Sequence, residues 1–398
     1  MRLSRTAAFV LQASLILLFL AGSSAPSPLY AVYQSAWGFS PIMITIIFGT
    51  YALAVLATLL VAGSLSDYTG RRPVLLVATL LQVITMAIFA TAHGVGALLV
   101  GRVVQGISVG MAGGAVGAGM IDIDREKGTL ANSALPPLGT ATGGLLAGLL
   151  AQYLPAPTVL VYVVLGVVFV GQLVALLFMP ESISPQPGAL ASLRPRIGLP
   201  PNLRRPTLLV APALVGAWAL AGFYLSLGPT LARRLLGSHS LALGGLVVFV
   251  LAASGSITVM LTRLRPAASL VTFGAAGLIV GVGLTLLAMA SMSSVVFFLG
   301  ATIAGMGFGA AFQGSMRMVL PLAAPHERAG VLSVLYVIAY LAMGLPAVLA
   351  GIGVVYGGGV IATAREYGMG VMALSSLALV GTLARRRSVS TVAAPAKS

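Results

Sequence analysis

The chain reads Gly63-Ser-Leu-Ser-Asp67-Tyr-Thr-Gly70-Arg71-Arg72-Pro73 between two long apolar segments. This run combines a carboxylate, two glycines and two adjacent guanidinium groups. Glycine lets two helices approach closely and lets a loop bend where a Cβ atom would clash. Arginines beside a membrane helix mark the side of the membrane on which a turn lies. We therefore predict a tight cytoplasmic turn between two membrane helices.

The composition is that of an integral membrane protein. Of the 398 residues, 59% are hydrophobic and 7% are charged, and the mean hydropathy is +1.06. A soluble domain carries about 25% charged residues, so this chain lacks the polar surface that water requires. The sequence has no cysteine and only dispersed histidines, which argues against an enzyme or a metal centre. The basic residues are scattered over short loops, which argues against a nucleic-acid partner.

Twelve apolar segments of the sequence are long enough to span a bilayer, which takes about 20 helical residues. They lie at roughly 7–28, 41–62, 74–92, 95–119, 131–152, 157–179, 207–230, 240–262, 267–290, 294–317, 329–351 and 366–384. We predict an all-α membrane protein with a six-helix bundle in residues 1–180, a basic cytoplasmic linker in 181–206, and a second six-helix bundle with a short basic tail in 207–398. The first segment resembles a signal peptide, but we expect it to remain as an uncleaved first helix.

The loop charges predict the orientation of the chain. With the N-terminus inside the cell, 18 of the 22 Lys and Arg residues lie in or beside cytoplasmic segments, whereas Arg233, Arg234 and Arg365 lie outside. This asymmetry favours two cytoplasmic termini. The halves also resemble each other, because Glu126-Lys-Gly128 after the fourth span is echoed by Glu327-Arg-Ala-Gly330 after the tenth. Such duplication is typical of transporters with a site between the repeats.

The run from Gly63 to Arg72 matches G-x-x-x-D-x-x-G-R-R, the signature of the loop between helices two and three of the major facilitator superfamily. Over nearly its whole length the chain resembles a member of this superfamily. The resemblance implies two pseudo-symmetric six-helix bundles and transport by alternating access. It also implies that Asp67 engages the positive start of helix eleven, near Arg328, and latches the bundles together on the cytoplasmic side. The other residues of this expected gate are Gly63, Gly70, Arg71 and Arg72. The alternative for Asp67 is a solvated carboxylate that caps a turn.

Arg102 is the one basic residue well inside a predicted span. A cation at that depth is costly, so it usually faces a cavity or a partner. The run Arg102-Val-Val-Gln105-Gly106 resembles the R-x-x-Q-G motif of helix four in the superfamily, which implies proton transfer or substrate contact by Arg102 and Gln105. The alternative is that Arg102 extends to the periplasmic surface. At the other end of this span, Asp122 is a candidate to join Asp67 and the arginines.

The fifth predicted span carries Gly139, Gly143 and Gly144. These glycines fit part of the antiporter motif G-P-x-x-G-G of the superfamily, but Thr140 stands where the motif has proline. Tight helix packing through small residues is a sufficient alternative explanation. The partial match therefore favours export.

We predict an apolar and aromatic interior, because no Asp or Glu falls at mid-depth in any predicted span. Proton relays require a titratable group, so a carboxylate near a helix end would have to serve. Aromatic faces with occasional hydrogen-bonding groups suit amphipathic ligands. On depth alone, the substrate-binding candidates are Trp218, Tyr224, Gln313, Tyr336 and Tyr340. For each of them a lipid-facing or packed position is the alternative.

These features predict a secondary active transporter of the bacterial inner membrane that exports small amphipathic molecules and is coupled to protons. The alternative is a carrier of sugars or other polar metabolites with the same fold. A membrane enzyme would need a nucleophile or metal cluster, and a sensor would show no substrate flux. We expect no cofactor and no metal, a monomer in contact with membrane lipid, and a small molecule and protons as the transported partners.

Overall fold

The computed structural model describes residues 2–392, and within them every regular element is a helix. Twelve helical segments are long and apolar enough to cross a membrane. This confirms the prediction of an all-α protein with twelve membrane spans. In chain order the elements are α1 (Arg5–Ser24), α2 (Pro26–Trp37), α3 (Pro41–Ala62), α4 (Ser66–Thr69), α5 (Arg71–Ala90), α6 (Val95–Ile123), α7 (Arg125–Tyr153), α8 (Leu160–Leu177), α9 (Ala189–Ser192), α10 (Pro201–Ser226), α11 (Gly228–Leu235), α12 (Leu241–Leu261), α13 (Ala267–Ser291), α14 (Ser294–Val319), the 3-10 helix η1 (Leu320–Leu322), α15 (Arg328–Tyr356) and α16 (Gly359–Val392).

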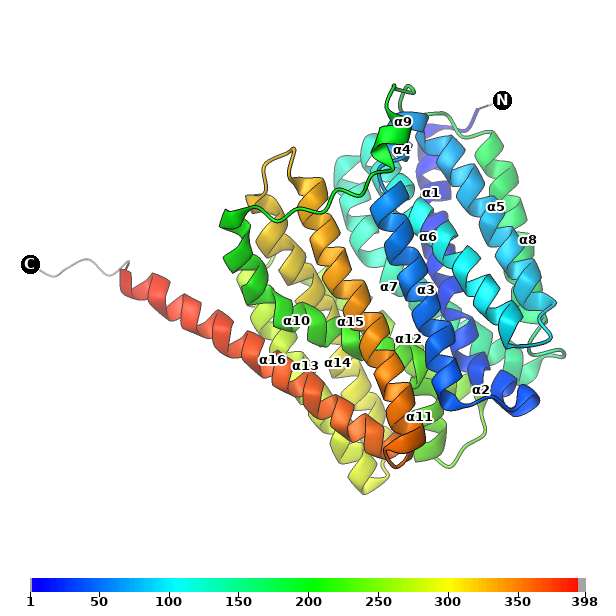
Figure 1. The fold of residues 1–398 in the computed structure, drawn as a ribbon, viewed down its shortest axis with the longest axis vertical. Helices are drawn as coiled ribbons and strands as arrows, with labels where there is room; N and C mark the ends of the chain where they lie inside the picture. Colours follow the sequence, from blue (N-terminus) through cyan, green and yellow to red (C-terminus); the bar gives the residue numbers. More distant parts are fainter. Residues whose placement is uncertain (1, 393–398) are drawn as a thin grey trace, which may run out of the picture.

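The spans form two bundles that lie side by side (Figure 1). One bundle buries apolar side chains from within residues 8–179, and the other buries those from within residues 203–378. The N-terminus, α4 and α9 lie at one end of the molecule, which we call the motif end because it holds residues 63–73. The helices α2 and α11 lie at the opposite end, which we call the α11 end.

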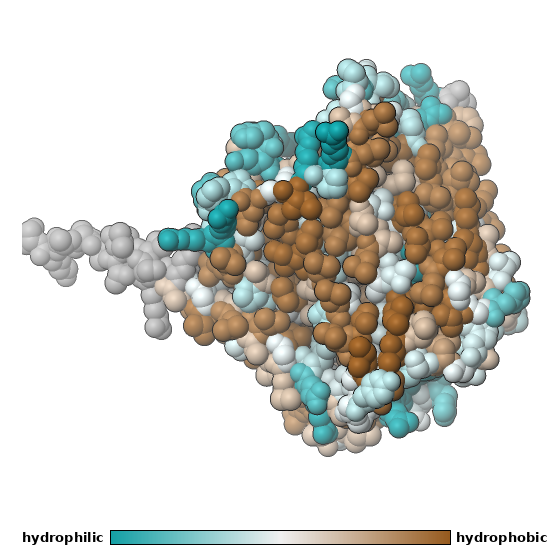
Figure 2. All heavy atoms as spheres, in the orientation of Figure 1, coloured by the Kyte–Doolittle hydropathy of each residue, from teal (hydrophilic) through white to brown (hydrophobic). Residues whose placement is uncertain are grey.

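Apolar side chains cover the outside of both bundles between these two ends. Figure 2 shows a broad hydrophobic belt, with hydrophilic residues gathered toward the ends. Val167, Leu349 and Val380 are 67%, 66% and 66% exposed. A hydrophobic surface of this extent is unusual on a soluble monomer but is what a lipid-facing surface requires.

The bundles touch most closely where glycines let their backbones meet. The helix α7 packs on α12, and α3 packs on α15. A Cβ atom at Gly148 would lie 2.8 Å from the carbonyl oxygen of Leu241 and 3.1 Å from the Cα atom of Gly245. In the other pair, Gly351 lies against the side chain of Thr45. Because these residues lie toward the α11 end of their helices, the two bundles are packed together at that end.

At the motif end, the segment between α8 and α10 crosses from one bundle to the other (Figure 1). Its Gln186 N–H donates to the carbonyl oxygen of Tyr68 in α4 at 2.8 Å. Further along, the N–H of Gly198 donates to the carbonyl oxygen of Gly330 in α15 at 3.5 Å. The linker therefore touches the signature loop of one bundle and the start of α15 in the other.

Two helix boundaries differ from the sequence prediction because of prolines. The first span continues as α2 to Trp37, beyond the predicted end at residue 28, after a break at Ala25. The helix α10 begins at Pro201, inside the predicted linker 181–206. Proline is favoured at the first position of a helix, where its missing N–H group is not needed.

The last span also begins earlier than predicted, at Gly359. Gly358 and Gly359 have φ angles of +91° and +92°, a conformation that glycine adopts at little cost. They keep the turn after α15 short. Arg365 and Glu366, expected at the start of this span, therefore lie in the second turn of α16. As far as Val392, the backbone of the predicted basic tail continues α16; its side chains from Arg385 onward, and residues 393–398 altogether, lie outside the described residues.

We expect Gly245→Val to destabilise the contact between the bundles. A Cβ atom at Gly245 would collide with the carbonyl oxygen of Gly144, and overpacking typically costs about 1–3 kcal/mol. The melting temperature of the purified protein in detergent should therefore fall. Gly171→Val in α8 is the matched control, because no neighbouring atom lies within 4 Å of a Cβ there. An equal fall in both variants would contradict the proposed role of Gly245.

Candidate functional site

The side chain of Arg71 joins three elements at the motif end. Its guanidinium group forms an ion pair with Asp67 of α4, and its Nε atom donates to Oδ2 of Asp122 at 3.2 Å. Its Nη1 atom also donates to Oγ of Ser66 at 2.8 Å. Arg71 is only 7% exposed, and charge-assisted bonds are stronger away from water. The structure thus brings together three of the predicted site residues, Asp67, Arg71 and Asp122.

The two signature glycines lie in close contact with neighbouring elements. Gly63 follows the last residue of α3, and its carbonyl group packs against Gly114 of α6, where a Cβ atom would collide with it. Gly70 has a φ angle of +100°, which favours glycine. A Cβ atom at Gly70 would also lie 2.6 Å from Oε2 of Glu181. The second glycine therefore leaves space for a carboxylate from outside the signature.

Glu181 is a candidate that the sequence analysis missed. Its Oε1 accepts the backbone N–H of Arg71 at 2.8 Å, and its Oε2 accepts that of Arg72 at 3.0 Å. The first N–H groups of a helix lack partners and carry partial positive charge, so this carboxylate stabilises the start of α5. The available signal was its position as an isolated acidic residue directly after the sixth span.

Arg72 makes contacts different from those of Arg71. Its Nη2 atom donates to the carbonyl oxygen of Leu177, the last residue of α8. A cation at a helix C-terminus interacts favourably with the carbonyl groups there. Its Nε atom is buried without a hydrogen-bond partner. Arg71 therefore links α5 to α6, and Arg72 links α5 to α8.

Among the described residues, Asp67 does not form the expected contact with the start of α15. The Asp67 side chain is 55% exposed and pairs with Arg71. Arg328 instead donates from Nε to the carbonyl oxygen of Ala323 at 3.3 Å. A pocket of about 400 Å³ lies at this point, lined by Arg196, Ile197, Gly198, Leu199, Pro200, His326, Glu327 and Gly330. The linker, rather than Asp67, lies beside the start of α15.

Arg102 is fully buried in the first bundle, with an exposed fraction of 0%. Its Nη1 atom donates to the carbonyl oxygen of Ser23 at 2.8 Å and to Oε1 of Gln105 at 2.6 Å. Its Nε atom donates to the hydroxyl of Tyr30 at 3.1 Å. The alternative in which Arg102 extends to the membrane surface is therefore wrong.

The break between α1 and α2 supplies acceptors for this cluster. Pro26 and Pro28 have no N–H group, so the carbonyl groups of Gly22 and Ser24 lose their usual helical donors. In a bilayer, such groups must find partners inside the protein. The Nε2 atom of Gln105 donates to the carbonyl oxygen of Gly22 at 3.0 Å. Residues of α6 thus satisfy the backbone of the broken first span.

The charge of Arg102 has no carboxylate partner among the described residues. The three ion pairs in that part of the chain all lie at the motif end. The guanidinium carbon instead lies 5.6 Å, 5.2 Å and 5.9 Å from the ring centroids of Tyr30, Tyr51 and Phe89. Aromatic ring faces attract cations at such distances. The cation is therefore stabilised by carbonyl dipoles and aromatic rings.

Aromatic side chains gather near mid-depth in the second bundle. The ring centroid of Trp218 lies 5.1 Å from that of Tyr340, 5.3 Å from that of Phe312 and 6.2 Å from that of Phe308. Tyr336 adjoins Tyr340, with centroids 6.2 Å apart. We call these five residues the aromatic cluster. Three of them were predicted substrate-binding residues, and Phe308 and Phe312 were missed, although their spacing of four places them on one helix face.

The aromatic cluster lies where the bundles meet. Trp218 and Tyr340 pack against a buried group that joins Phe48 and Ala52 of α3, in the first bundle, to Met343 and Ala347 of α15, in the second. The indole N–H group of Trp218 is buried without a hydrogen-bond partner. Leaving a buried donor unpaired costs about 1–3 kcal/mol. An acceptor on a bound molecule could satisfy it.

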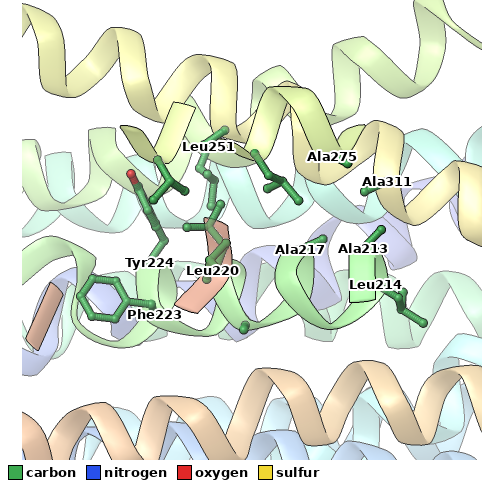
Figure 3. Close-up of a cluster of buried hydrophobic side chains, with 14 of the residues drawn as sticks. Ala213, Leu214, Ala217, Leu220, Phe223, Tyr224, Leu251, Ala275 and Ala311 are labelled. Atoms are coloured by element: carbon green, nitrogen blue, oxygen red, sulfur yellow. The ribbon is translucent and has the colours of Figure 1, made fainter. Parts of the chain in front are cut away.

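Two predicted substrate-binding residues lie outside the aromatic cluster. Tyr224 lies in the apolar core of the second bundle (Figure 3), with its hydroxyl 3.3 Å from Oγ1 of Thr285. Gln313 donates to the carbonyl oxygen of Val259 at 3.2 Å and accepts from Thr262 at 3.1 Å. Depth along a span had selected these residues, but depth does not reveal which face of a helix a side chain occupies.

The glycines of the fifth span pack α7 against both bundles. A Cβ atom at Gly139 would collide with the carbonyl oxygen of Leu17 in α1, and Gly143 lies against Ala21 of the same helix. A Cβ atom at Gly144 would lie 2.7 Å from the side chain of Val248 in α12. Close helix packing accounts for all three small residues.

Comparison with known proteins identifies a family. A family model described as Major Facilitator Superfamily matches residues 13–347, which confirms the resemblance predicted from the signature loop. The chain is 36% identical over 73 residues to the multidrug resistance protein MdtL of Klebsiella pneumoniae (strain 342), and 38% identical over 109 residues to the tetracycline resistance protein, class C, of Escherichia coli. These matches cover 18% and 26% of this chain, and the chain spans only 19% and 27% of the length of those relatives.

Solved structures share the fold. The nucleoside transporter NupG, in a variant form, has a TM-score of 0.70 at 11% identity, over 96% of this chain and 98% of its own. The human organic anion transporter MFSD10 (TETRAN) has a TM-score of 0.66 at 19% identity, over 96% of this chain and 99% of its own. At these identities the likeness shows the fold alone.

We expect Glu181→Ala to lower the melting temperature of the purified protein. The change leaves the N–H groups of Arg71 and Arg72 without their acceptors, and loss of such a cap costs about 0.5–2 kcal/mol. Glu366→Ala, which removes an exposed carboxylate within α16, is the matched control and should change the melting temperature little. The capping role is refuted if both variants melt at the wild-type temperature.

Proposed function

The chain belongs to the major facilitator superfamily, and we propose that it exports small amphipathic molecules across the bacterial inner membrane in exchange for protons. As a member of this family it is a transporter rather than an enzyme. The observation that carries the proposal is the aromatic cluster between the bundles. Ring faces bind the flat apolar parts of a ligand, and the unpaired indole N–H of Trp218 offers a donor to a polar group. The drug-resistance names of two relatives support export of such compounds.

The chemistry of the aromatic cluster favours amphipathic cargo over sugars or other polar metabolites. A carrier of polar molecules needs several free hydrogen-bonding side chains along its path. The aromatic cluster offers only the hydroxyls of Tyr336 and Tyr340 and the indole of Trp218. Gln313, the amide expected to serve there, is already bonded to α12.

Alternating access about the aromatic cluster accounts for how the two bundles meet. They pack closely at the α11 end, whereas at the motif end the linker connects the signature loop to α15. We place the motif end in the cytoplasm, because most Lys and Arg residues lie there. This conformer is then closed toward the outside. In the opposite conformer Asp67 reaches the start of α15, whose partial positive charge attracts a carboxylate.

Proton coupling is proposed to act at the motif end. Arg102 has no carboxylate partner, whereas Asp67 and Asp122 share the guanidinium group of Arg71. Asp67 is 55% exposed, so it can exchange protons with water. A proton on either carboxylate neutralises one of the two negative charges beside Arg71 and weakens its ion pair with that residue. Protonation would thereby free the loop to move.

The first test uses bacteria that lack their own efflux pumps. Cells that express this chain should accumulate less of a fluorescent lipophilic cation than cells with an empty vector. A protonophore should abolish the difference, because it removes the proposed driving force. Asp67→Asn and Arg102→Ala should each weaken export at equal expression, since they remove the proposed gate carboxylate and the buried cation.

Arg317→Ala, which changes an exposed arginine in the last turn of α14, is the control and should export normally. Unchanged accumulation in cells whose membranes contain folded protein would overturn export of lipophilic cations. Export that persists with the protonophore would overturn proton coupling. Altered uptake of nucleosides or sugars instead would support the polar-metabolite alternative.

Trp218→Leu should lower the apparent affinity for an exported aromatic compound by about fivefold. An aromatic contact contributes about 1 kcal/mol beyond the area that it buries. Phe273→Leu removes an aromatic ring that is 44% exposed on α13, so it should leave the affinity unchanged. Concentration-dependent transport into inverted membrane vesicles provides the measurement. Equal affinities for wild type and Trp218→Leu would exclude the aromatic cluster as the binding site.

A further inference from the structure

Arg233 and Arg234 stand at the end of the molecule that otherwise holds few charges. They occupy the last turn of α11, and of the seven acidic residues in the chain only Glu366 belongs to a helix segment near that end. Membrane proteins usually keep arginine on the cytoplasmic side. A pair of arginines at the opposite side therefore suggests an anionic partner.

Arg233 lacks such a partner within the protein. Among the described residues neither Arg233 nor Arg234 forms an ion pair, and the Nε atom of Arg233 is buried without a hydrogen-bond partner. Burial also lowers the pKa of the Arg233 guanidinium group, because desolvation disfavours its charged form. An external acceptor would satisfy this donor and restore the lost solvation.

A pocket of about 680 Å³ begins at the residues that directly follow the arginine pair. Its apolar wall comes from the end of α11, the start of α12 and the turn between α13 and α14: Leu235, Leu236, Leu243, Met292, Val295 and Phe298. Ser238 also lines the pocket, and its N–H group donates to the carbonyl oxygen of Arg233 at 3.0 Å. Leu235 and Leu236 directly follow the two arginines in the chain, so the pocket wall begins at the turn of α11 that carries them, although neither arginine lines the pocket itself.

The pocket and α11 are arranged as at a membrane interface. The helix α11 buries Leu231 and Leu235 while Arg234 is exposed, which is the pattern of an amphipathic helix at a bilayer surface. Met292 and Val295 at the pocket are 58% and 76% exposed. These exposed apolar side chains give the pocket a rim that an acyl chain can cover.

We propose that the pocket and the arginine pair bind one anionic phospholipid from the leaflet at the α11 end. The phosphate accepts hydrogen bonds from Arg233 and Arg234, and an acyl chain lies along the apolar wall. The apolar wall favours a lipid over a soluble anion, and the two unpaired cations favour an anionic headgroup over a zwitterionic one. This inference does not depend on the direction or cargo of transport.

The test measures lipid binding to the purified full-length chain by native mass spectrometry. Phosphatidylglycerol should bind more tightly than phosphatidylcholine with the same acyl chains. The double variant Arg233→Gln/Arg234→Gln should weaken phosphatidylglycerol binding about thirtyfold, at about fivefold for each basic residue near an anionic lipid. Arg204→Gln/Arg205→Gln, which removes two exposed charges from the start of α10, should leave this affinity unchanged.

A second variant separates the pocket from the charges. Ser294→Trp fills the pocket from its wall without changing the net charge, and it should also weaken phosphatidylglycerol binding. Glycerol phosphate should not displace the lipid, because it has no acyl chain. Equal binding of the two phospholipids, or equal losses in both double arginine variants, would overturn the proposal. Displacement by glycerol phosphate would overturn it in favour of a soluble anion. If the double variant at α11 fails to fold, the tryptophan variant and the lipid comparison decide.

Discussion

A polar group inside the hydrocarbon layer must find its partner within the protein, and the first bundle is built around this constraint. Pro26 leaves the carbonyl group of Gly22 without its helical donor, and Arg102 brings a charge that lipid cannot solvate. The two groups satisfy each other's needs for hydrogen bonds, because carbonyl groups of the broken first span accept from the side chains of Arg102 and Gln105. In a straight first helix, the carbonyl group of Ser23 would not be free to accept from Arg102. A shorter side chain at position 102 would not reach that carbonyl group from α6. The break and the buried arginine therefore form one structural unit.

The same principle links the elements of the first bundle at the motif end. Arg71 is almost excluded from water, so its charge is balanced by Asp67 and Asp122. Glu181, in the segment after α8, caps the start of α5. These bonds join four neighbouring elements of one bundle, and none of them reaches the other bundle. Relative motion of the two bundles can therefore leave the bonds of Arg71 to Asp122 and Ser66, and those of Glu181, in place.

The sequence predicted the features that depend on length and spacing, and it missed those that depend on helix faces. Twelve spans follow from apolar length, and the signature loop follows from residues in fixed order. The break at Ala25 was missed because the apolar segment continues through it, although the two prolines that follow were visible. Tyr224 was placed with the path on depth alone, yet it faces the core. Glu181 was overlooked because its partners are backbone N–H groups, which have no signature in the sequence.

In the proposed transport cycle, the linker and the signature loop would compete for the same place at the start of α15. Gly198 lies against Gly330 near the start of α15, where the family resemblance expects Asp67. Asp67 is exposed and bound to Arg71, while Arg71 has a second carboxylate partner in Asp122. If Asp67 breaks its ion pair with Arg71, the buried guanidinium group still has Asp122 as a partner. The ion pair with Asp122 must then be kept. In the proposed transport cycle, closure of the motif end would require the linker to withdraw from α15 while Asp122 holds Arg71. Because Asp122 still balances the buried charge of Arg71, loss of the Asp67 contact does not leave that charge unpaired.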